Sequence, residues 1–157
     1  DSDYEKLEGA FQVLRDFAVP HGARVLSAHR TPDEAHRFAS TAEEDGVEVV
    51  ICAAGLAAHL AGVIASKTIL PVIGVPVEGG PLKGIDALLA TVQMPAGVPV
   101  ATVGISNGTN AALLAVQILA RADAGLADRL RAYKATMAEK VANKDARLQE
   151  KIEAAGS

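Results

Sequence analysis

Two short, nearly continuous apolar segments constrain the fold of this chain most strongly. Residues 47–54 and 70–77 are composed almost entirely of aliphatic side chains, glycine and proline. A strand with one solvated face alternates apolar and polar residues, whereas an unbroken apolar strand is covered on both faces. Each segment is followed by a helical pattern, over residues 57–67 and 85–92. Strands that alternate with helices predict a parallel sheet with helices on both sides.

The rest of the chain extends this alternation. Capping-box patterns, in which a hydroxyl residue precedes a glutamate by three positions, occur at Ser2–Glu5 and Thr31–Glu34 and predict helix starts. The segment 106–110 predicts a third helix start. The expected fold is therefore α/β, a three-layer sandwich with a central parallel sheet, flavodoxin-like or Rossmann-like. Further helices are expected over 1–18, from 31 to before Gly46, and over 111–120, and further strands over 24–27 and 98–103.

The chain changes character near its C-terminus. From Ala124 onward it is charged, and its apolar residues form a narrow helical stripe that is typical of a long helix lying across a neighbour. We expect residues 1–123 to form the α/β domain and residues 124–157 to pack on a neighbouring subunit. The helix at 111–120 is apolar on almost every side, so other subunits are expected to bury it. The stripe consists of Leu126, Leu130, Tyr133, Met137, Val141, Leu148 and Ile152.

Composition excludes several classes of protein. The 157 residues carry 15 basic and 19 acidic side chains, a net charge of −4 without a basic cluster, which disfavours a nucleic-acid partner. No apolar run approaches the length of a membrane span. The single cysteine, Cys52, excludes an intrachain disulfide, fits a reducing cytoplasmic compartment, and is expected to be inert core. The sequence has neither the spacing of a zinc site nor a GxGxxG or GxxxxGK[ST] loop, so no metal or cofactor is predicted.

The candidate site lies in the loops that follow the strands, because ligands of such sheets bind beyond the strands' carboxyl ends. His29 and Arg30 in the first loop can exchange a proton near neutral pH and bind an anion. Equally well, His29 satisfies backbone groups in a turn and Arg30 is solvated. For His59 alone, a helix cap or a subunit contact is the more frequent role. His21 and His36 are expected at the surface.

Five motifs then occur in a characteristic order. They are SAHRTP (27–32), AAHL (57–60), GVPV (74–77), QMPAGVPVATV (93–103) and NAALLA (110–115). Together they resemble the class I N5-carboxyaminoimidazole ribonucleotide mutases of purine biosynthesis, the family of the phosphoribosylaminoimidazole carboxylase catalytic subunit. The likeness runs from Asp1 to about Ala122.

The resemblance implies a cytoplasmic homo-octameric isomerase that moves a carboxylate from the exocyclic nitrogen of a ribonucleotide to C4. It implies decarboxylation and recarboxylation in a closed pocket, without metal, biotin or nucleotide. His29 then corresponds to the general acid/base and Arg30 to the phosphate-binding arginine. Ser2 and Asp3 correspond to the end of a loop that holds phosphate and ribose. The base and carboxylate pocket corresponds to Ser27, Ala54, Gly55, His59 and Leu60.

The sequence also departs from this family. The family's first strand and the Gly-Ser of its phosphate loop are expected before Asp1, since the chain opens on a helix cap. The family's GAGG reads Ala53-Ala54-Gly55-Leu56 here, and Ala61 replaces a proline. Two alternatives remain: direct carboxylation of aminoimidazole ribonucleotide by CO2, as in class II relatives that differ in the AAHL segment, and a non-catalytic nucleotide-binding α/β module.

Overall fold

A computed structural model describes residues 4–155 of the chain. These residues divide between two compact units, one ending at Leu119 and the other beginning at Ala120. The first unit contains all the described strands and five helices. In chain order the elements are α1 (Tyr4–Asp16), α2 (Pro32–Thr41), β1 (Val50–Gly55), α3 (Leu60–Ala65), β2 (Val72–Val77), α4 (Ile85–Val92), β3 (Ala101–Thr102), α5 (Gly108–Leu119) and α6 (Ala124–Ala155).

The strands form a parallel sheet in the order β1-β2-β3. β1 and β2 pair along their whole length, from Val50 opposite Val72 to Gly55 opposite Val77. The carboxyl ends of β1 and β2 therefore lie side by side at one edge of the sheet. Gly74 in β2 allows α4 to approach, because a Cβ there would collide with Thr91 Cγ2 of that helix.

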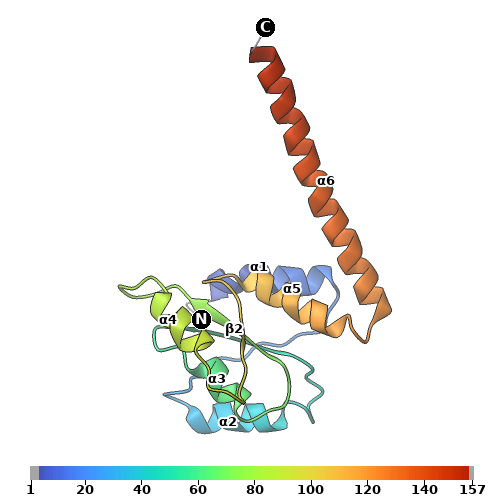
Figure 1. Cartoon of the computed structure of the whole chain (residues 1–157). Helices are drawn as coiled ribbons and strands as arrows, with labels where there is room; N and C mark the ends of the chain where they lie inside the picture. The colour runs from blue at the N-terminus through green and yellow to red at the C-terminus, as the bar shows by residue number, and fades with distance from the viewer. Residues whose placement is uncertain (1–3, 156–157) are drawn as a thin grey trace. The chain divides into compact units, whose positions relative to one another are not determined.

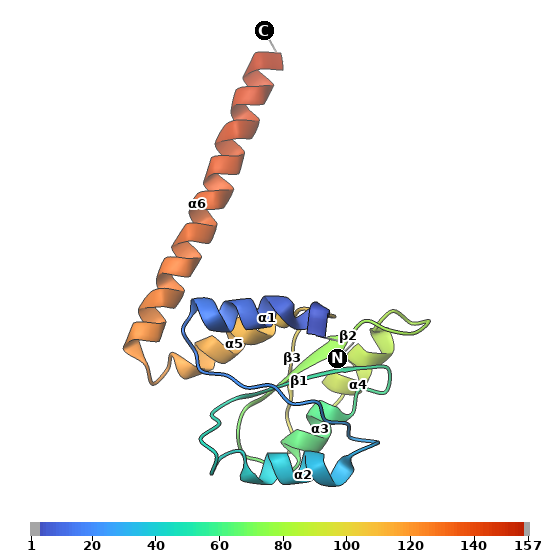
Figure 2. The ribbon, with the colours of Figure 1, turned by 180° about the vertical axis from the view of Figure 1, so that it is seen from behind.

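Two apolar clusters cover the two faces of the sheet. One joins Cys52 of β1 to Ala35 of α2 and Ile64 of α3, and the other joins Ile73 and Val75 of β2 to α5. Figures 1 and 2 show α1 and α5 on one side of the sheet and α2 and α3 on the other. The predicted three-layer α/β fold with a parallel sheet is confirmed.

One predicted strand was wrong. Residues 24–27 form no strand, and Val25 is 87% exposed. A strand needs a neighbour to receive its backbone hydrogen bonds, and in the described part of the chain β1 pairs only with β2. The strand predicted at 98–103 shrinks to β3, because Pro99 has no N–H for a ladder and Val98 N donates to Pro95 O in a turn.

The helix starts were predicted with mixed success. Helix α2 starts where predicted, with Thr31 as its N-cap residue, but the capping bond is absent because the Thr31 hydroxyl bonds to Ser27. The start of α5 was right, since Asn107 Oδ1 accepts a hydrogen bond of 3.0 Å from Asn110 N. The helix expected at 57–67 begins only at Leu60. Ser2, the other predicted cap, lies outside the described residues.

Helix α5 is buried more completely within one chain than its composition suggested. Gly108, Ala111, Ala112, Ala115 and Val116 are buried, so these residues need no second subunit to cover them. The cover comes partly from α1, which approaches so closely that a Cβ on Gly108 would lie 3.3 Å from Ala10 Cβ. Small residues at this contact let the two helix backbones come together.

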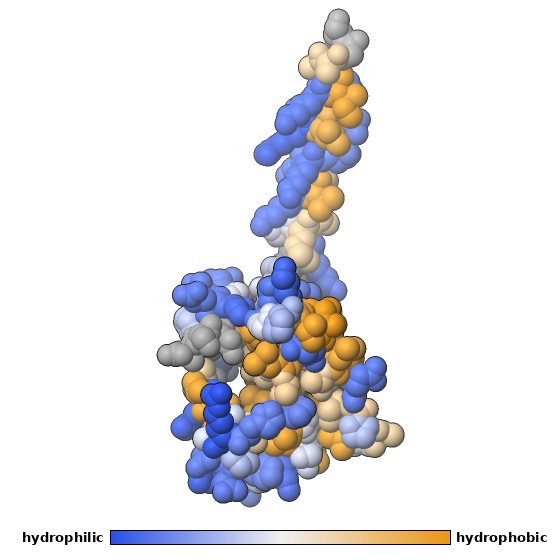
Figure 3. Space-filling view, turned by 90° about the vertical axis from the view of Figure 1, so that its left-hand side faces the viewer, coloured by the Kyte–Doolittle hydropathy of each residue, from blue (hydrophilic) through white to orange (hydrophobic). Residues whose placement is uncertain are grey.

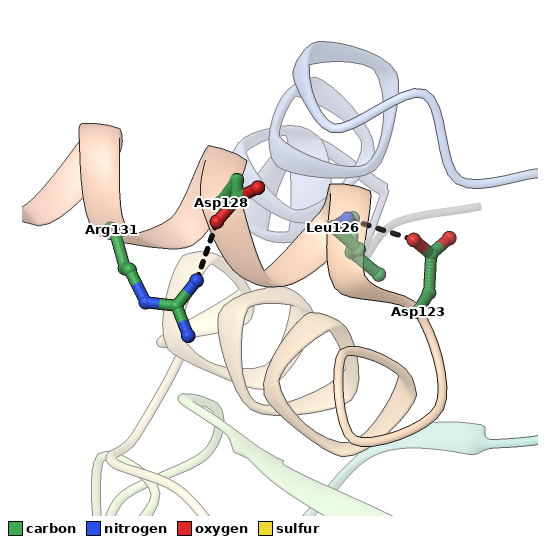
Figure 4. A network of polar contacts seen from close by, with 4 residues as sticks. All are labelled: Asp123, Leu126, Asp128 and Arg131. Atoms are coloured by element: carbon green, nitrogen blue, oxygen red, sulfur yellow. Dashed lines mark hydrogen bonds and ion pairs between the residues drawn. The ribbon is translucent and has the colours of Figure 1, made fainter.

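The second unit consists mainly of α6. Asp123 caps this helix by accepting a 2.9 Å hydrogen bond from Leu126 N, and Asp128 pairs with Arg131 at 2.5 Å in its first turns (Figure 4). Farther along, apolar side chains follow one side of the helix (Figure 3). Met137, Val141, Leu148 and Ile152 are all exposed. Among residues 4–155, helices capable of spanning a membrane are absent.

Candidate active site

The structure brings together two histidines from the loops selected by sequence. His29 Nε2 lies 2.9 Å from His59 Nδ1, within hydrogen-bond distance. The rings meet edge to face, with centroids 5.0 Å apart and planes at 76°. Both side chains are exposed in the single chain, so a ligand can reach them.

A compact turn presents His29. Ser27 O accepts a hydrogen bond from Thr31 N at 3.0 Å, and Ser27 Oγ accepts one from Arg30 N at 3.1 Å. The Thr31 hydroxyl donates to Ser27 O and accepts from Ser27 N. Ser27 and Thr31 therefore close the loop on itself, and His29 and Arg30 occupy its exposed tip. The sequence interpretation of Ser27 as a pocket wall omitted this structural role.

His59 is presented by the segment that follows β1. Ala58 N donates to Leu56 O, and His59 N donates to Ala57 O, each at 2.8 Å. These bonds span two residues, so two successive tight turns delay the start of α3 until Leu60. His59 makes no side-chain cap for α3, although capping was the more frequent role for a lone histidine there. Its ring bonds to His29 instead.

The other predicted site residues differ in their burial and in the element that holds them. Ala54 and Gly55 end β1 and Leu60 begins α3, all three half-buried. Arg30 is exposed next to His29 in the chain. Ser2 and Asp3 lie outside the described residues. Two segments therefore hold the described site residues, and the histidine contact joins them. The first is the loop with Ser27, His29 and Arg30, and the second runs from the end of β1 to the start of α3, with Ala54, Gly55, His59 and Leu60.

A polar network in the neighbouring loops escaped sequence analysis. Lys6 Nζ of α1 donates to Glu78 O at 2.6 Å, and Glu78 N donates to Ser106 Oγ at 3.0 Å. Ser106 N in turn donates to Pro76 O at 2.8 Å. The network fastens the loop after β2 to α1 and to the loop after β3. These two side-chain bonds join residues that lie 72 and 28 positions apart in the chain, and no local pattern signals such a pairing.

Metal binding and thiol chemistry find no support in the described residues. Across residues 4–155, His, Cys, Asp and Glu side chains nowhere gather in threes suitable for a metal ion. Cys52 is buried in β1, as predicted, and desolvation raises the pKa of its thiol to about 12. Such a thiol stays protonated at neutral pH and is a poor ligand and nucleophile. His21 is exposed and bonds to Val19 O, as expected of a surface residue.

The histidine pair can hold and transfer one proton. A hydrogen bond between two imidazole nitrogens needs one N–H donor and one free lone pair. The accepting ring is therefore neutral while the contact persists, and the donating ring, when it too is neutral, has a free lone pair on its other nitrogen that can act as a base. Arg30, which follows His29 in the same loop and is exposed, carries a positive charge that can attract an anionic ligand. The arrangement suits proton transfer to and from a bound anion.

The chain matches known proteins over most of its length. A family model described as AIR carboxylase matches residues 1–140. The N5-carboxyaminoimidazole ribonucleotide mutase of Pyrococcus horikoshii is 51% identical over 150 residues, which cover 96% of this chain and 85% of the relative. The mutase of Aquifex aeolicus is 57% identical over 118 residues, covering 75% of this chain and 71% of the relative.

The fold agrees with these matches. The crystal structure of Treponema denticola PurE superposes with a TM-score of 0.85 at 28% identity, covering 94% of this chain and 92% of that one. The family match begins at residue 1, ends within α6 at residue 140, and includes both histidine loops. This chain belongs to the AIR carboxylase family.

Proposed function

We propose that this protein is an isomerase of purine biosynthesis that converts N5-carboxyaminoimidazole ribonucleotide into 4-carboxyaminoimidazole ribonucleotide. The observation that carries the proposal is the 2.9 Å contact between His29 and His59 beside Arg30, at the carboxyl edge of the sheet. Relatives named as this mutase, about half identical to the chain, support the same activity.

The reaction needs two proton movements and no net change in atoms. The bond between the exocyclic nitrogen and the carboxylate carbon breaks, its electron pair stays on nitrogen, and nitrogen takes up a proton. The released CO2 is then attacked by C4, which forms a new carbon–carbon bond and gives up its own proton. We assign His29 as the group that supplies and removes these protons, because imidazole can act as acid and base near neutral pH.

The remaining residues bind and orient the substrate. His59 keeps the His29 ring oriented through their hydrogen bond, and Arg30 binds the 5′-phosphate. Ala54, Gly55 and Leu60 line the carboxylate side with small or apolar groups, and Ser27 shapes the loop through Arg30 N. Ser2 and Asp3 hold phosphate and ribose. No cofactor is assigned, because protonation of the nitrogen is enough for a carbamate to lose CO2.

The proposal includes an assembly and a compartment. We infer a homo-octamer in which residues 124–157 pack on neighbouring subunits, and the exposed apolar side of α6 supports this arrangement. A cytoplasmic location follows from the proposed biosynthetic role. The substrate is a small ribonucleotide, and the acidic balance of the chain, −4 without a basic cluster, gives no support for a nucleic-acid partner.

An isotope experiment tests the proposed function. The substrate is labelled in its carbamate carbon and incubated with the enzyme in excess unlabelled bicarbonate. An isomerase that keeps its CO2 transfers the label into the C4 carboxylate. Complete loss of label, with a rate that rises in proportion to added CO2, would instead show direct carboxylation.

Direct carboxylation is the second candidate because the matching family model is described as AIR carboxylase. The acceptor in that reaction is aminoimidazole ribonucleotide, and C4 attacks CO2 taken from solution. The same proton must leave C4, so the same residues serve. Supplying aminoimidazole ribonucleotide and CO2 without the carbamate would then give product at the full rate.

A further inference from the structure

Leu56 occupies a backbone conformation that ordinarily belongs to glycine. Its φ is +55°, in the left-handed region, where a side chain meets its own backbone. The residue directly follows Gly55 at the end of β1. A strained conformation that persists near a functional site points to a role for the residue.

The Leu56 side chain contacts the glycine-rich loop 78–84. A Cβ built on Gly80 would lie only 2.7 Å from Leu56 Cδ2, so the leucine methyl lies directly over the backbone of Gly80. Gly80 has a φ of +59°, and the neighbouring Gly79 has open space where its Cβ would be. The contact is therefore specific to one position of the loop. Its partner, Leu56, keeps 54% of its surface exposed.

Three hydrogen bonds also hold the same loop. Its first residue, Glu78, is fixed through Lys6 and Ser106, and its turn is closed by a 3.4 Å bond from Lys83 N to Gly80 O. The loop begins next to Leu56 because Gly55 and Val77 are paired in the sheet. Through its contact with Gly80, Leu56 thus links the segment after β1 to the loop after β2, just beyond the last paired residues of the two strands.

The backbone of Leu56 also leads to the histidine pair. Its carbonyl accepts the first of the two bonds that form the tight turns up to His59. A change in the backbone at Leu56 would redirect the segment that presents His59. One residue therefore links the position of loop 78–84 to the contact between His59 and His29.

We propose that Leu56 is a positioning residue that holds loop 78–84 against the exit of β1 and completes an apolar wall that retains CO2. The second part rests on the proposed function, in which CO2 exists free between bond cleavage and bond formation. CO2 carries no charge and can stay beside an apolar wall, whereas water and bicarbonate lose hydration there. Leu56 would thereby favour return of CO2 to C4 over its escape.

Hydrogen exchange of the full-length protein tests the anchoring of the loop. Leu56→Gly removes the side chain and relieves the positive φ, so the variant is expected to fold. The amides of Gly80, Leu82, Lys83 and Gly84 should exchange faster than in the wild type, whereas in Leu56→Met, which keeps a long apolar side chain, they should exchange as slowly as in the wild type. Unchanged exchange of these amides in Leu56→Gly would overturn the proposal.

A pair of glycine substitutions provides an independent measurement. Gly80→Ala places a methyl against Leu56, and Gly79→Ala, one position away, meets nothing within 4 Å. The shift in unfolding temperature caused by Gly80→Ala should differ between the wild-type and Leu56→Gly backgrounds, whereas the shift caused by Gly79→Ala should be the same in both. Equal shifts for Gly80→Ala in the two backgrounds would contradict the contact.

Label transfer tests the wall itself. With carbamate-labelled substrate in excess unlabelled bicarbonate, Leu56→Gly should lose part of the label that the wild type retains and should release aminoimidazole ribonucleotide. Leu56→Met should keep the label. If the wild type keeps the label and Leu56→Gly keeps all of it too, the CO2 role is refuted and the anchoring of the loop is not. A wild type that makes no product from this substrate would refute the proposed function and the CO2 role together, and hydrogen exchange would still decide whether Leu56 anchors the loop.

Discussion

His29 Nε2 and His59 Nδ1 lie 2.9 Å apart although 30 positions separate the two residues in the chain. The contact requires one nitrogen to donate and the other to accept. If both rings were protonated, both nitrogens would carry hydrogen and the contact would break. The contact therefore requires one neutral imidazole, and both rings are exposed to an incoming substrate.

The first prediction concerns His29. His29→Asn should reduce turnover by about 10²–10⁴-fold, because general acid–base catalysis contributes this much, while the fold and nucleotide affinity remain. His21→Asn is the matched control, since His21 is exposed and its ring contacts Val19 O and Phe11, which are not among the site residues. Steady-state kinetics and a binding titration measure both effects. Turnover near the wild-type rate in His29→Asn would disprove the assignment.

The second prediction concerns the coupling of the pair. His59→Phe keeps a ring of similar size but removes the nitrogen that bonds to His29, so turnover should fall. In the His29→Asn background the same change should have little further effect, because the bond it breaks is already absent. The two substitutions should therefore show a coupling free energy of about 0.5–3 kcal/mol in kcat. Strictly additive losses would mean that His59 acts independently of His29.

The third prediction concerns Arg30. Arg30→Ala should weaken nucleotide binding by roughly 1.5–3 kcal/mol, the usual size of a hydrogen bond to a charged group. Arg37→Ala is a suitable control, because Arg37 is an exposed arginine of α2. Calorimetric titration should also show that the wild type binds the dephosphorylated nucleoside more weakly. Equal affinity for nucleotide and nucleoside would rule out a phosphate contact.

Local patterns predicted most of the fold. The apolar runs gave β1 and β2 to within three residues, and α4 was predicted with its observed bounds. The strand predicted over residues 24–27 was wrong because strand formation depends on a pairing partner elsewhere in the chain, which local sequence does not contain. Thr31 marks the start of α2 as predicted, but its hydroxyl makes no capping bond because it bonds to Ser27.

The candidate site was predicted less completely than the fold. The strand-exit rule selected the loops of His29 and His59, but the contact between the rings depends on how those loops fold in space. The bond from Lys6 to Glu78 O joins residues 72 positions apart, and a lysine on a helix surface gives no sign of it. The role of Leu56 became visible only through its positive φ and its neighbour Gly80.

The fourth prediction concerns Cys52. Burial raises the pKa of this thiol from 9.0 to about 12, so the folded protein resists ionising it. The contribution to stability is fully present below pH 9 and is lost as the pH rises toward 12, because the unfolded chain ionises first. The free energy of unfolding of the wild type should therefore fall more steeply between pH 9 and 12 than that of Cys52→Ala. A thiol reagent should label Cys52 in denaturant and spare the native protein near neutral pH, and rapid native labelling would contradict its burial.

The last prediction concerns assembly. Met137, Val141, Leu148 and Ile152 of α6 are between 42% and 66% exposed in one chain, and burying such a side chain fully is worth about 1.5–3 kcal/mol. A subunit contact along this side explains why the residues are apolar, so light scattering at micromolar concentration should give the mass of eight chains. Val141→Lys should shift the protein toward smaller species, because a charge would lose hydration at the contact. Glu139→Ala, at an exposed position on the opposite side of the same helix, should leave the mass unchanged. A wild type with the mass of a single chain would refute the assembly.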